Sequence, residues 1–516
     1  MFQIKNVTLV YRKDLRTIID DLSLTLNYGD RAVMIGEEGN GKSTLMKWIY
    51  DPSLIEDYVE YTGEKAVSGE KLGYLPQELP EEDRDKTVYE YFCESIFFAE
   101  QTPGDLSKTA NDFGVEKEFW YRDQKMKTLS GGERVKAQMM RILMESPTIL
   151  LLDEPSNDID IETLELMEKL INGWKGAVLF ISHDETLIEH TANRVVHFEQ
   201  LRRKTKCRHT VANVPYRQYV EERLRGFEKQ EQMAITDRKE KEIRDAKYRR
   251  LLSQVEHAQG SVSRQAPSVG KNLKDKMHSV KSMGKRFERL DEQMTEMPEQ
   301  EEAIFFKLGD DTSAIPSGKW VIQYEKEILT TADESRVLAR NLELKIRGSE
   351  KIAIVGTNGC GKTTLISLIA RQLLERSDLR AVYMPQDYEK LLDMDMTPVD
   401  FLDPSGDKEQ RTRIRTYLGA LKYTADEMDH PIRELSGGQK AKVLLLKMSM
   451  SDANVLILDE PTRNFSPLSG PVIRRMLREF PGAIISVSHD RKYLSEVCDK
   501  IYRLSESGLA VVEKSE

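Results

Sequence analysis

The 516-residue sequence has few cysteines and no long hydrophobic run. Its cysteines, Cys93, Cys207, Cys360 and Cys498, share no CxxC or metal-ligand spacing and are too sparse for a disulfide framework, so we expect a reducing, cytoplasmic environment. The longest apolar runs have the length of a β-strand, not the roughly 18–20 residues that cross a bilayer. This argues against an integral membrane protein, and the first residues predict no secretion signal.

Neither sign of charge dominates strongly. The chain carries 77 Lys or Arg against 87 Asp or Glu, a formal net charge of −10, and 39% of its residues are hydrophobic. At roughly 100–200 residues per domain, the length allows about three domains, each large enough to bury its own core. The acidic total argues weakly against a nucleic-acid partner, which the distribution of charge along the chain must test.

Five short motifs occur twice in the same order, which indicates two homologous domains. The longest is the glycine-rich segment Gly36–Ser43, which recurs as Gly356–Thr363. The other four pairs are 75–77 and 384–386, 129–132 and 435–438, 152–155 and 458–461, and 182–184 and 488–490. We therefore predict a first repeat at 1–204, an unrelated linker at 205–317 and a second repeat at 318–516.

Each glycine-rich segment follows a strand-like run and precedes a helix-like run, as a P-loop requires. Its glycines let backbone N–H groups close around phosphates, its lysine neutralises charge, and its Ser or Thr reaches Mg²⁺. A chance glycine turn is the alternative, and two copies with the same flanks argue against it. The predicted phosphate-binding residues are Gly36, Gly39, Asn40, Gly41, Lys42, Ser43, Thr44, Gly356, Asn358, Gly359, Gly361, Lys362, Thr363 and Thr364.

Two continuously apolar runs that read as buried strands each end in Asp-Glu. Ligands of open α/β sheets bind at the carboxyl ends of the strands. Asp153 and Asp459 are therefore predicted to hold Mg²⁺, with Ser43 and Thr363, and Glu154 and Glu460 are candidate general bases. The alternative is that these carboxylates only cap the turn that follows.

Two further strand-like runs end in a histidine, His183 and His489. A single histidine at the end of a strand is more often structural than catalytic. Its repetition after two complete P-loop and Asp-Glu pairs favours a catalytic role.

The Leu-Ser-Gly-Gly motif at 129–132 and 435–438 is typical of the ATP-binding cassette superfamily, which the sequence resembles over both repeats. The resemblance implies ATP and Mg²⁺ as ligands, Gln77 and Gln386 as Q-loop residues near the metal, and His183 and His489 as switch histidines near the γ-phosphate. It also implies that the two repeats of one monomer pair head to tail around two ATP molecules. Each P-loop would then face the signature residues of the other repeat, which are Ser130, Gly131 and Gly132, and Ser436, Gly437 and Gly438.

Two departures from the family pattern predict unequal ATP sites. Tyr11, 25 residues before Gly36, is similar to the aromatic residue that stacks on adenine, whereas the equivalent residue before Gly356 is Thr331. Adenine stacking at the second P-loop would need Tyr324 or another ring. The second D-loop has Ser466 where the first has Asp160.

The linker is predicted to form an antiparallel helical hairpin. One heptad seam is Leu273, Val280, Phe287 and Met294, and the alternate seam is Met283, Leu290 and Met297, broken by Lys276. The Gly-, Pro- and Ser-rich segment 259–270 is predicted to interrupt the helix, which puts the tip at 254–276. Arms of about 35–40 residues would reach on the order of 50–60 Å.

The charge of the linker contrasts with the acidic total. Residues 243–290 hold 12 Lys or Arg against 4 Asp or Glu, and an acid-free cluster, Arg202, Arg203, Lys204, Lys206 and Arg208, lies just before the hairpin. A solvated helix face is the alternative, but a one-signed excess near a tip favours contacts with RNA phosphates. The candidate RNA-binding residues are Arg249, Arg250, Arg264, Lys271, Lys274 and Lys276.

Two fused cassettes without a membrane segment resemble the ABC-F proteins, which act on ribosomes. Within them the sequence is similar to the antibiotic-resistance group, because the interval between Gln77 and Ser130 holds no long inserted arm and the second D-loop resembles that of proteins against lincosamides, streptogramin A and pleuromutilins. The resemblance implies that the hairpin enters the tRNA exit site of the 70S ribosome and reaches toward rRNA, P-site tRNA and the peptidyl-transferase centre. ATP hydrolysis would release it.

Three other functions stay open. A housekeeping ABC-F translation factor would share this chemistry without a drug phenotype. A genome-maintenance ATPase would bind duplex DNA in preference to ribosomes. An exporter subunit fits least well, because the sequence encodes no transmembrane domain.

Overall fold

The computed structural model describes residues 2–67, 69–201, 206–260, 267–291, 294–298, 308, 313–331, 334, 336–403, 405–463 and 465–512. The chain forms two compact units. One unit contains both repeats and spans Met1–Tyr216 and Glu301–Glu516, and the other is Arg217–Gln300. Within the part of the chain that is described, no helix is both long and apolar enough to cross a membrane.

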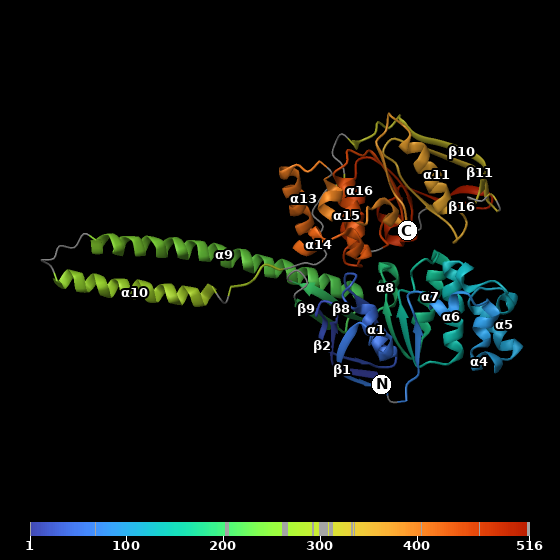
Figure 1. Ribbon diagram of the computed structural model, residues 1–516, viewed down its shortest axis with the longest axis horizontal. Coiled ribbons are helices and arrows are strands. Elements are labelled where there is room, and N and C mark those ends of the chain that lie inside the picture. Colours follow the sequence, from blue (N-terminus) through green and yellow to red (C-terminus); the bar gives the residue numbers. More distant parts are fainter. Residues whose placement is uncertain are drawn as a thin grey trace. The chain divides into compact units, whose positions relative to one another are not determined.

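The first repeat is built on a six-stranded sheet whose strands are parallel except for the last pair (Figure 1). In sheet order the strands are β5 (Leu72–Leu75), β6 (Ile149–Asp153), β7 (Ala177–Ile181), β3 (Arg31–Ile35), β8 (Arg194–Leu201) and β9 (Lys206–Ala212). Every residue of β6 and β7 is buried, which explains why their sequences are continuously apolar. The P-loop, the Asp-Glu pair and the histidine all follow these parallel strands and so meet at one edge of the sheet.

An antiparallel sheet and a set of helices complete the first repeat. The sheet has the order β2 (Thr17–Leu26), β1 (Phe2–Tyr11) and β4 (Val59–Ala66). The helices are α1 (Lys42–Tyr50), α2 (Glu81–Arg84), α3 (Val88–Cys93), α4 (Ile96–Ala99), α5 (Pro103–Asp112), α6 (Gly131–Met144), α7 (Ile161–Gly173) and α8 (Glu185–Thr191). Apolar residues of both sheets and of α1 form one core.

The second repeat has the same architecture. Its six-stranded sheet has the order β13 (Ala381–Met384), β14 (Val455–Asp459), β15 (Ala483–Val487), β12 (Lys351–Val355), β16 (Lys500–Ser505) and β17 (Gly508–Val512), and β10 (Trp320–Thr330) pairs with β11 (Val337–Arg347). The helices are α11 (Lys362–Leu374), α12 (Pro398–Leu402), α13 (Lys408–Ala420), α14 (Ala425–Asp429), α15 (Gly437–Ser449), α16 (Gly470–Glu479) and α17 (Arg491–Glu496). The predicted α/β fold of two P-loop domains joined by a long helical linker is confirmed.

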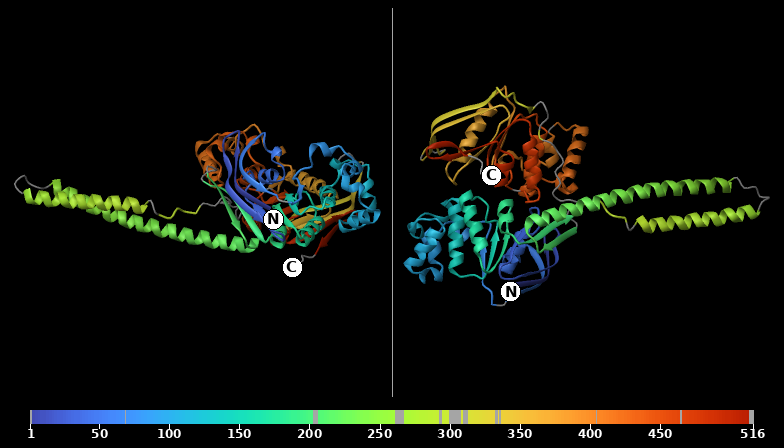
Figure 2. Two further views of the ribbon diagram at one scale, coloured as in Figure 1. Left: turned by 90° about the horizontal axis from the view of Figure 1, so that it is seen from below. Right: turned by 180° about the vertical axis from the view of Figure 1, so that it is seen from behind.

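The linker unit is a pair of antiparallel helices, α9 (Tyr216–Gly260) and α10 (Pro267–Asp291), which run side by side in every view (Figure 2). The Tyr248 and Phe287 rings meet edge to face with centroids 6.0 Å apart. Lys241 and Arg244 of α9 both form ion pairs with Asp291, the last residue of α10. A Cβ at Gly284 would lie 2.6 Å from the Tyr248 hydroxyl, so a larger residue here would require the Tyr248 side chain to move.

Three details of the predicted hairpin are wrong. The arms are unequal, with 45 residues in α9 and 25 in α10. Helix continues to Gly260 and restarts at Pro267, because proline is accommodated at the first position of a helix, where its missing N–H has no partner in any case. The interruption between the helices is therefore shorter than the predicted segment 259–270. Its remaining residues, 261–266, lie outside the described residues.

The third error concerns the alternate heptad seam. Met283 is half-buried as predicted, but Leu290 and Met297 are 40% and 36% exposed, and Met277 and Gly284, one position later than this seam, are half-buried as well. The helix also ends at Asp291, so Met294 and Met297 lie beyond it. The first predicted seam is confirmed at three positions of α10, since Leu273, Val280 and Phe287 are all partly buried.

Candidate functional site

Both glycine-rich segments form loops that lead into a helix, α1 or α11, and both lysines fold back onto their own loop. Lys42 Nζ donates to the carbonyl oxygens of Gly36 and Glu37 at 2.7 and 2.9 Å. Lys362 Nζ makes the equivalent bonds to Gly356 and Thr357, both at 2.9 Å. The loop conformation depends on its glycines: Gly36 has φ 142°, and a Cβ there would lie 2.3 Å from the Phe198 carbonyl oxygen. Both loops therefore have the form that encloses phosphates.

A buried carboxylate lies beside the P-loop hydroxyl in the first repeat. Ser43 Oγ donates to Asp153 Oδ1 at 2.9 Å, and the Tyr74 hydroxyl lies 3.5 Å from the other oxygen. Burial, together with the neighbouring Glu154, raises the pKa of Asp153 to about 6. A carboxylate whose charge is this costly to bury, beside a hydroxyl, suits a divalent cation.

The second repeat offers the same pair of groups. Burial raises the pKa of Asp459 to about 6, and the nearby Thr363 hydroxyl opposes that shift. Within the described ranges there is no cluster of three or more His, Cys, Asp and Glu side chains that could hold a metal. This agrees with Mg²⁺ bound by one or two protein oxygens and by substrate phosphates, and the residues present fit it.

The two glutamates that follow these aspartates are held in strained backbone conformations. Glu154 and Glu460 both have φ 52°, in the left-handed region that non-glycine residues seldom adopt. Each backbone N–H donates to a carbonyl on the next strand, Ile181 or Val487. The strain is therefore fixed by the sheet, and it occurs at the two candidate general bases.

The glutamate and histidine of the first repeat form a close pair. His183 Nε2 lies 3.0 Å from Glu154 Oε1. His183 Nδ1 donates to the carbonyl oxygen of Phe465, in the second repeat, at 2.7 Å. Burial opposes a charged imidazole, but the Glu154 carboxylate outweighs it and the pKa of His183 is raised. The carbonyl of one repeat therefore orients a candidate catalytic pair in the other.

The equivalent pair in the second repeat is looser. His489 Nε2 is 3.9 Å from Glu460 Oε1, and neither ring nitrogen has a hydrogen-bond partner among the residues that the structure describes. Burial, reinforced by Asp459, raises the pKa of Glu460 to about 8. Burial and the charge of Lys362 lower the pKa of His489 to about 4. Near neutral pH this histidine is uncharged, so the two histidines differ in the direction of their pKa shift as well as in their distance from the glutamate.

Both signature motifs sit at the start of a helix. Ser130 and Ser436 are the N-caps of α6 and α15, each in a capping box with the residue three positions on, Glu133 or Gln439. The first backbone N–H groups of such helices have no partner within the helix and attract anions. Both signatures can therefore contact a phosphate brought to them.

The structure brings each P-loop against the signature of the other repeat. We call the P-loop Gly36–Ser43 with the signature Ser436–Gly438 the first site. We call the P-loop Gly356–Thr363 with the signature Ser130–Gly132 the second site.

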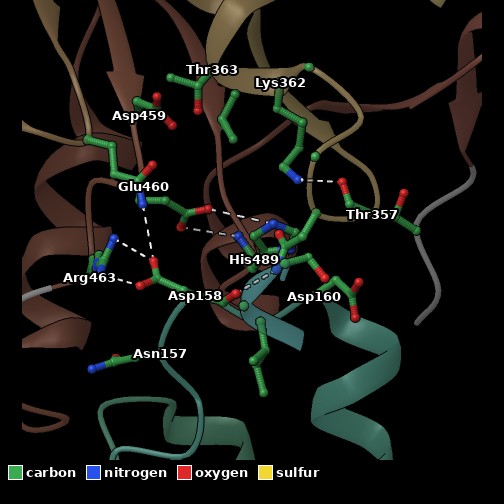
Figure 3. A pocket seen from close by; sticks show the side chains of 18 of the residues that line it. Asn157, Asp158, Asp160, Thr357, Lys362, Thr363, Asp459, Glu460, Arg463 and His489 are labelled. Carbon is green, nitrogen blue, oxygen red and sulfur yellow. Dashed lines mark hydrogen bonds and ion pairs between the residues drawn. The ribbon is translucent and has the colours of Figure 1, made fainter. Parts of the chain in front are cut away.

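The second site encloses a cavity of about 940 Å³ lined by residues of both repeats (Figure 3). The D-loop residue Asp158 connects the repeats there. It forms an ion pair with Arg463 at 2.8 Å, and its carbonyl oxygen accepts from Asn358 Nδ2 at 2.5 Å. Gln386 Nε2 also donates to its carboxylate, at 3.3 Å, whereas Gln77, the other predicted Q-loop residue, is exposed.

At the first site, acidic P-loop residues make the contacts. The Glu38 carboxylate accepts from the backbone N–H of Gly438 at 2.5 Å. Glu37 Oε2 accepts from Lys442 Nζ at 3.0 Å. The equivalent P-loop residues at the second site are the neutral Thr357 and Asn358, so the two sites are joined by different chemistry.

The surroundings of the adenine position also differ. The Tyr11 ring stacks on Tyr58 with centroids 6.5 Å apart, and the Arg16 guanidinium lies 5.3 Å from its centre. Thr331 lines the cavity of the second site, as its position predicts. Tyr324 does not replace the missing ring, because it is 8% exposed and packs in the core of the second repeat.

Sequence reasoning missed several residues that line or join these sites. They are Glu37, Glu38, Asp158, Arg336 and Arg463. The glutamates occupy variable positions of the P-loop motif, and two adjacent acids in a phosphate-binding loop were a signal that could have been read. Asp158 and Arg463 follow the Asp-Glu pairs, but only the pairing of the repeats brings them together.

Most of the predicted RNA-binding residues lie on exposed faces of the hairpin. Those described are Arg249, Arg250, Lys271, Lys274 and Lys276, all exposed. Arg264 lies outside the described residues, as do 202–204 of the preceding basic cluster. Lys206 and Arg208 of that cluster are exposed on β9.

A protein-family model described as ABC transporter matches residues 19–157 and 339–463, one segment in each repeat. The chain is 27% identical to the ATP-binding protein Uup of Escherichia coli strain K12, over 92% of this chain and 76% of Uup. It is also 27% identical to the ribosome protection protein VmlR of Bacillus subtilis strain 168, over 96% of this chain and 85% of VmlR.

Among solved structures, the chain is similar to the archaeal ribosome recycling factor aABCE1, which was crystallised with a ribosomal stalk protein. The TM-score is 0.58, the sequence identity is 16%, and the match covers 98% of this chain and 89% of that one. At this identity the likeness shows the fold alone.

Proposed function

The chain belongs to the ABC transporter family of ATP-binding proteins, in which it is similar to ABC-F members, and from that premise we propose that it is an ATP-driven ribosome-binding factor. ATP would bind at both sites, between the P-loop of one repeat and the signature of the other. Lys42 and Lys362 would neutralise phosphate charge, and the N-termini of α6 and α15 would contact the terminal phosphate. Nucleotide binding would thereby hold the repeats together.

Hydrolysis is assigned to the strained glutamates. Glu154 and Glu460 would accept a proton from the attacking water, with His183 and His489 beside them. Magnesium would be held by Ser43 and Asp153, or by Thr363 and Asp459, and would supply neutralisation of phosphate charge. Loss of the terminal phosphate removes the group that each signature helix contacts, which favours separation of the repeats.

The observation that carries the ribosome proposal is the exposed basic surface of the long helical hairpin. Arg249 and Arg250 on α9 and Lys271, Lys274 and Lys276 on α10 are all exposed. Such residues provide affinity for phosphates without reading sequence, which suits folded RNA. We propose that the hairpin enters the tRNA exit site and protects the peptidyl-transferase centre from lincosamides, streptogramin A or pleuromutilins. The relation to a protein named for ribosome protection supports this direction.

The experiment is to trap the complex before hydrolysis. We expect the double variant Glu154→Gln, Glu460→Gln to co-sediment with 70S ribosomes in the presence of ATP and to stay in the supernatant without it. The unmodified protein with ATP is the matched control, and it should dissociate during the spin. A double variant that never co-sediments would contradict ribosome binding.

A housekeeping translation factor is the second candidate, because the chain is no more similar to the ribosome protection protein VmlR than to Uup, which is named only as an ATP-binding protein, at 27% identity for both. The two functions are separated by expressing the chain in a drug-sensitive host and measuring inhibitory concentrations. Protection predicts a rise for at least one of the three drug classes, lost in the double variant. Ribosome binding with unchanged inhibitory concentrations would favour the housekeeping function.

A further inference from the structure

The first site contains a buried acidic residue for which ATP binding and hydrolysis provide no role. The Glu37 side chain is 12% exposed and reaches across to the second repeat. Its Oε2 accepts from Lys442 Nζ at 3.0 Å, and its Oε1 accepts from Ser469 Oγ at 2.8 Å and Ser466 Oγ at 3.2 Å. Burial opposes ionisation, but Lys442 and the two hydroxyls outweigh it and lower the pKa of Glu37. The P-loop of the first repeat thus places the charged carboxylate of Glu37 against the D-loop of the second repeat.

At the second site the acidic residue belongs to the D-loop instead of the P-loop. There Asp160, the D-loop residue equivalent to Ser466, accepts from the backbone N–H and hydroxyl of Thr163 at 3.0 and 2.8 Å. Burial opposes its ionisation, but the hydrogen bonds from Thr163 and from the backbone N–H of Asn358, in the facing P-loop, lower the pKa of Asp160. The P-loop residue equivalent to Glu37 is the neutral Thr357.

At each site, the two positions to compare are the P-loop position of Glu37 or Thr357 and the D-loop position of Ser466 or Asp160. At each site one of these two residues is acidic and the other is neutral. At the second site the D-loop supplies the acid, and at the first site the P-loop does. Two carboxylates at such a contact would repel each other in a largely buried position. This accounts for Ser466, since an aspartate there would stand against Glu37.

The bonds of Glu37 lead directly to the candidate catalytic pair. Ser466 is the neighbour of Phe465, whose carbonyl oxygen accepts from His183 Nδ1 at 2.7 Å. His183 in turn lies 3.0 Å from Glu154. At the second site the equivalent P-loop side chain is the neutral Thr357, and among the described residues neither ring nitrogen of His489 has a hydrogen-bond partner.

We propose that Glu37 is a positioning residue for the first site, which supplies the carboxylate missing from the second D-loop and so holds the Phe465 carbonyl against His183. The inference rests on the ATP hydrolysis assigned to Glu154 in the proposed function. It adds that the second D-loop is fixed by an acid from the opposite repeat.

The test is a double-mutant cycle on steady-state ATP turnover in a Glu460→Gln background, in which the first site alone would hydrolyse. Glu37→Thr leaves Lys442, 6% exposed, without its carboxylate, and Ser466→Asp sets two carboxylates about 3 Å apart. We expect each change to lower kcat on the order of tenfold, with a smaller effect on KM for ATP. The pair Glu37→Thr, Ser466→Asp leaves a single acid at this contact and removes the repulsion, so its kcat should exceed that of either single variant.

Glu38→Thr is the matched control, because Glu38 is the next residue but contacts Gly438 instead of the D-loop. Adding Ser466→Asp to Glu38→Thr should bring no recovery. Recovery specific to Glu37 also rules out misfolding as the cause of the single-variant losses. Additive losses in the Glu37→Thr, Ser466→Asp pair, or a change confined to KM, would overturn the inference while leaving the proposed function intact. A Glu460→Gln background without turnover would contradict the hydrolysis assigned to Glu154, and the inference would fall with it.

Discussion

At the scale of single residues, the equivalent glutamate–histidine pairs of the two repeats differ in their electrostatics. Glu154 is paired with a histidine whose pKa is raised, whereas Glu460 has a pKa of about 8 beside a histidine with a pKa of about 4. Burial opposes a charged imidazole at both positions, but the Glu154 carboxylate, 3.0 Å away, outweighs it at His183, whereas the charge of Lys362 reinforces it at His489. His183 also donates to the Phe465 carbonyl oxygen, and among the described residues the ring of His489 has no hydrogen-bond partner.

This difference predicts distinct pH profiles for the two sites. A carboxylic acid with a raised pKa is protonated below that value, so Glu460 becomes a competent base only as the pH approaches about 8. In a Glu154→Gln variant, kcat/KM for ATP should rise about tenfold per pH unit below pH 8 and then level off. In the matched Glu460→Gln variant, kcat/KM for ATP should not show this tenfold rise per pH unit below pH 8. Identical profiles for the two variants would contradict the assignment of the general bases.

At the scale of elements, the hairpin depends on one close contact between its helices. Gly284 of α10 faces the Tyr248 hydroxyl of α9, and the Tyr248 ring meets Phe287 edge to face. The Arg244 guanidinium lies 5.1 Å from the centre of the Phe287 ring. A glycine in the middle of a helix lowers its intrinsic stability, so its presence here is explained by packing.

We therefore expect Gly284→Val to loosen α10 from α9, at a cost of about 1–3 kcal/mol typical of overpacking. The measurement is limited proteolysis of the full chain, with cleavage in α10 scored against time. Tyr248→Ala in the same chain removes the obstructing ring and should slow cleavage again, relative to Gly284→Val alone. Cleavage of Gly284→Val at the unmodified rate would show that the contact is unimportant.

How much the sequence predicts depends on how strictly chemistry fixes each residue. Phosphate binding needs glycines, lysine and hydroxyl at set spacings, so both P-loops, both Asp-Glu pairs and the sheet that carries them could be predicted. The variable positions of the same motif are not constrained in this way. Glu37 and Glu38 make their contacts with a segment about 400 residues away, which no local pattern reveals.

The hairpin was predicted in outline and missed in detail for a similar reason. Charge and apolar spacing identify a long pair of helices, but the register between them is set by particular contacts such as Gly284 with Tyr248. The predicted interruption failed at Pro267 because proline starts a helix as readily as it ends one. Asp291, where α10 ends, is held by two basic residues of α9 that no spacing rule identifies.

At the scale of the whole molecule, acidic and basic charge are segregated. The net charge is −10, yet residues 243–290 carry 12 basic against 4 acidic side chains. The overall charge therefore hides a segment of opposite sign, residues 243–290 of the linker. This resolves the initial argument against a nucleic-acid partner.

Reversing the hairpin charge should weaken ribosome binding and flatten its salt dependence. The changes are Arg249→Glu, Arg250→Glu, Lys271→Glu, Lys274→Glu and Lys276→Glu, introduced together into the trapped double variant. For every basic side chain that no longer binds a phosphate, the slope of log affinity against log salt should fall by roughly one.

The matched control reverses the same number of exposed lysines on the repeats, Lys108, Lys117, Lys169, Lys175 and Lys408. This control should bind ribosomes with an unchanged salt slope, and both chains should retain basal ATP turnover. Equal losses for hairpin and control would mean that overall charge, and not the hairpin, governs binding.

The placement of one acid at each boundary also bears on which partners the repeats accept. If two copies of the first repeat paired with each other, Glu37 of each would meet Asp160 of the other, and carboxylates would oppose one another twice. Two copies of the second repeat would set Thr357 against Ser466, with no acid at either boundary. Only the pairing of a first repeat with a second repeat places one acid at each boundary. The acids at these boundaries therefore disfavour the pairing of two first repeats, and they are compatible with the pairing of a first repeat with a second.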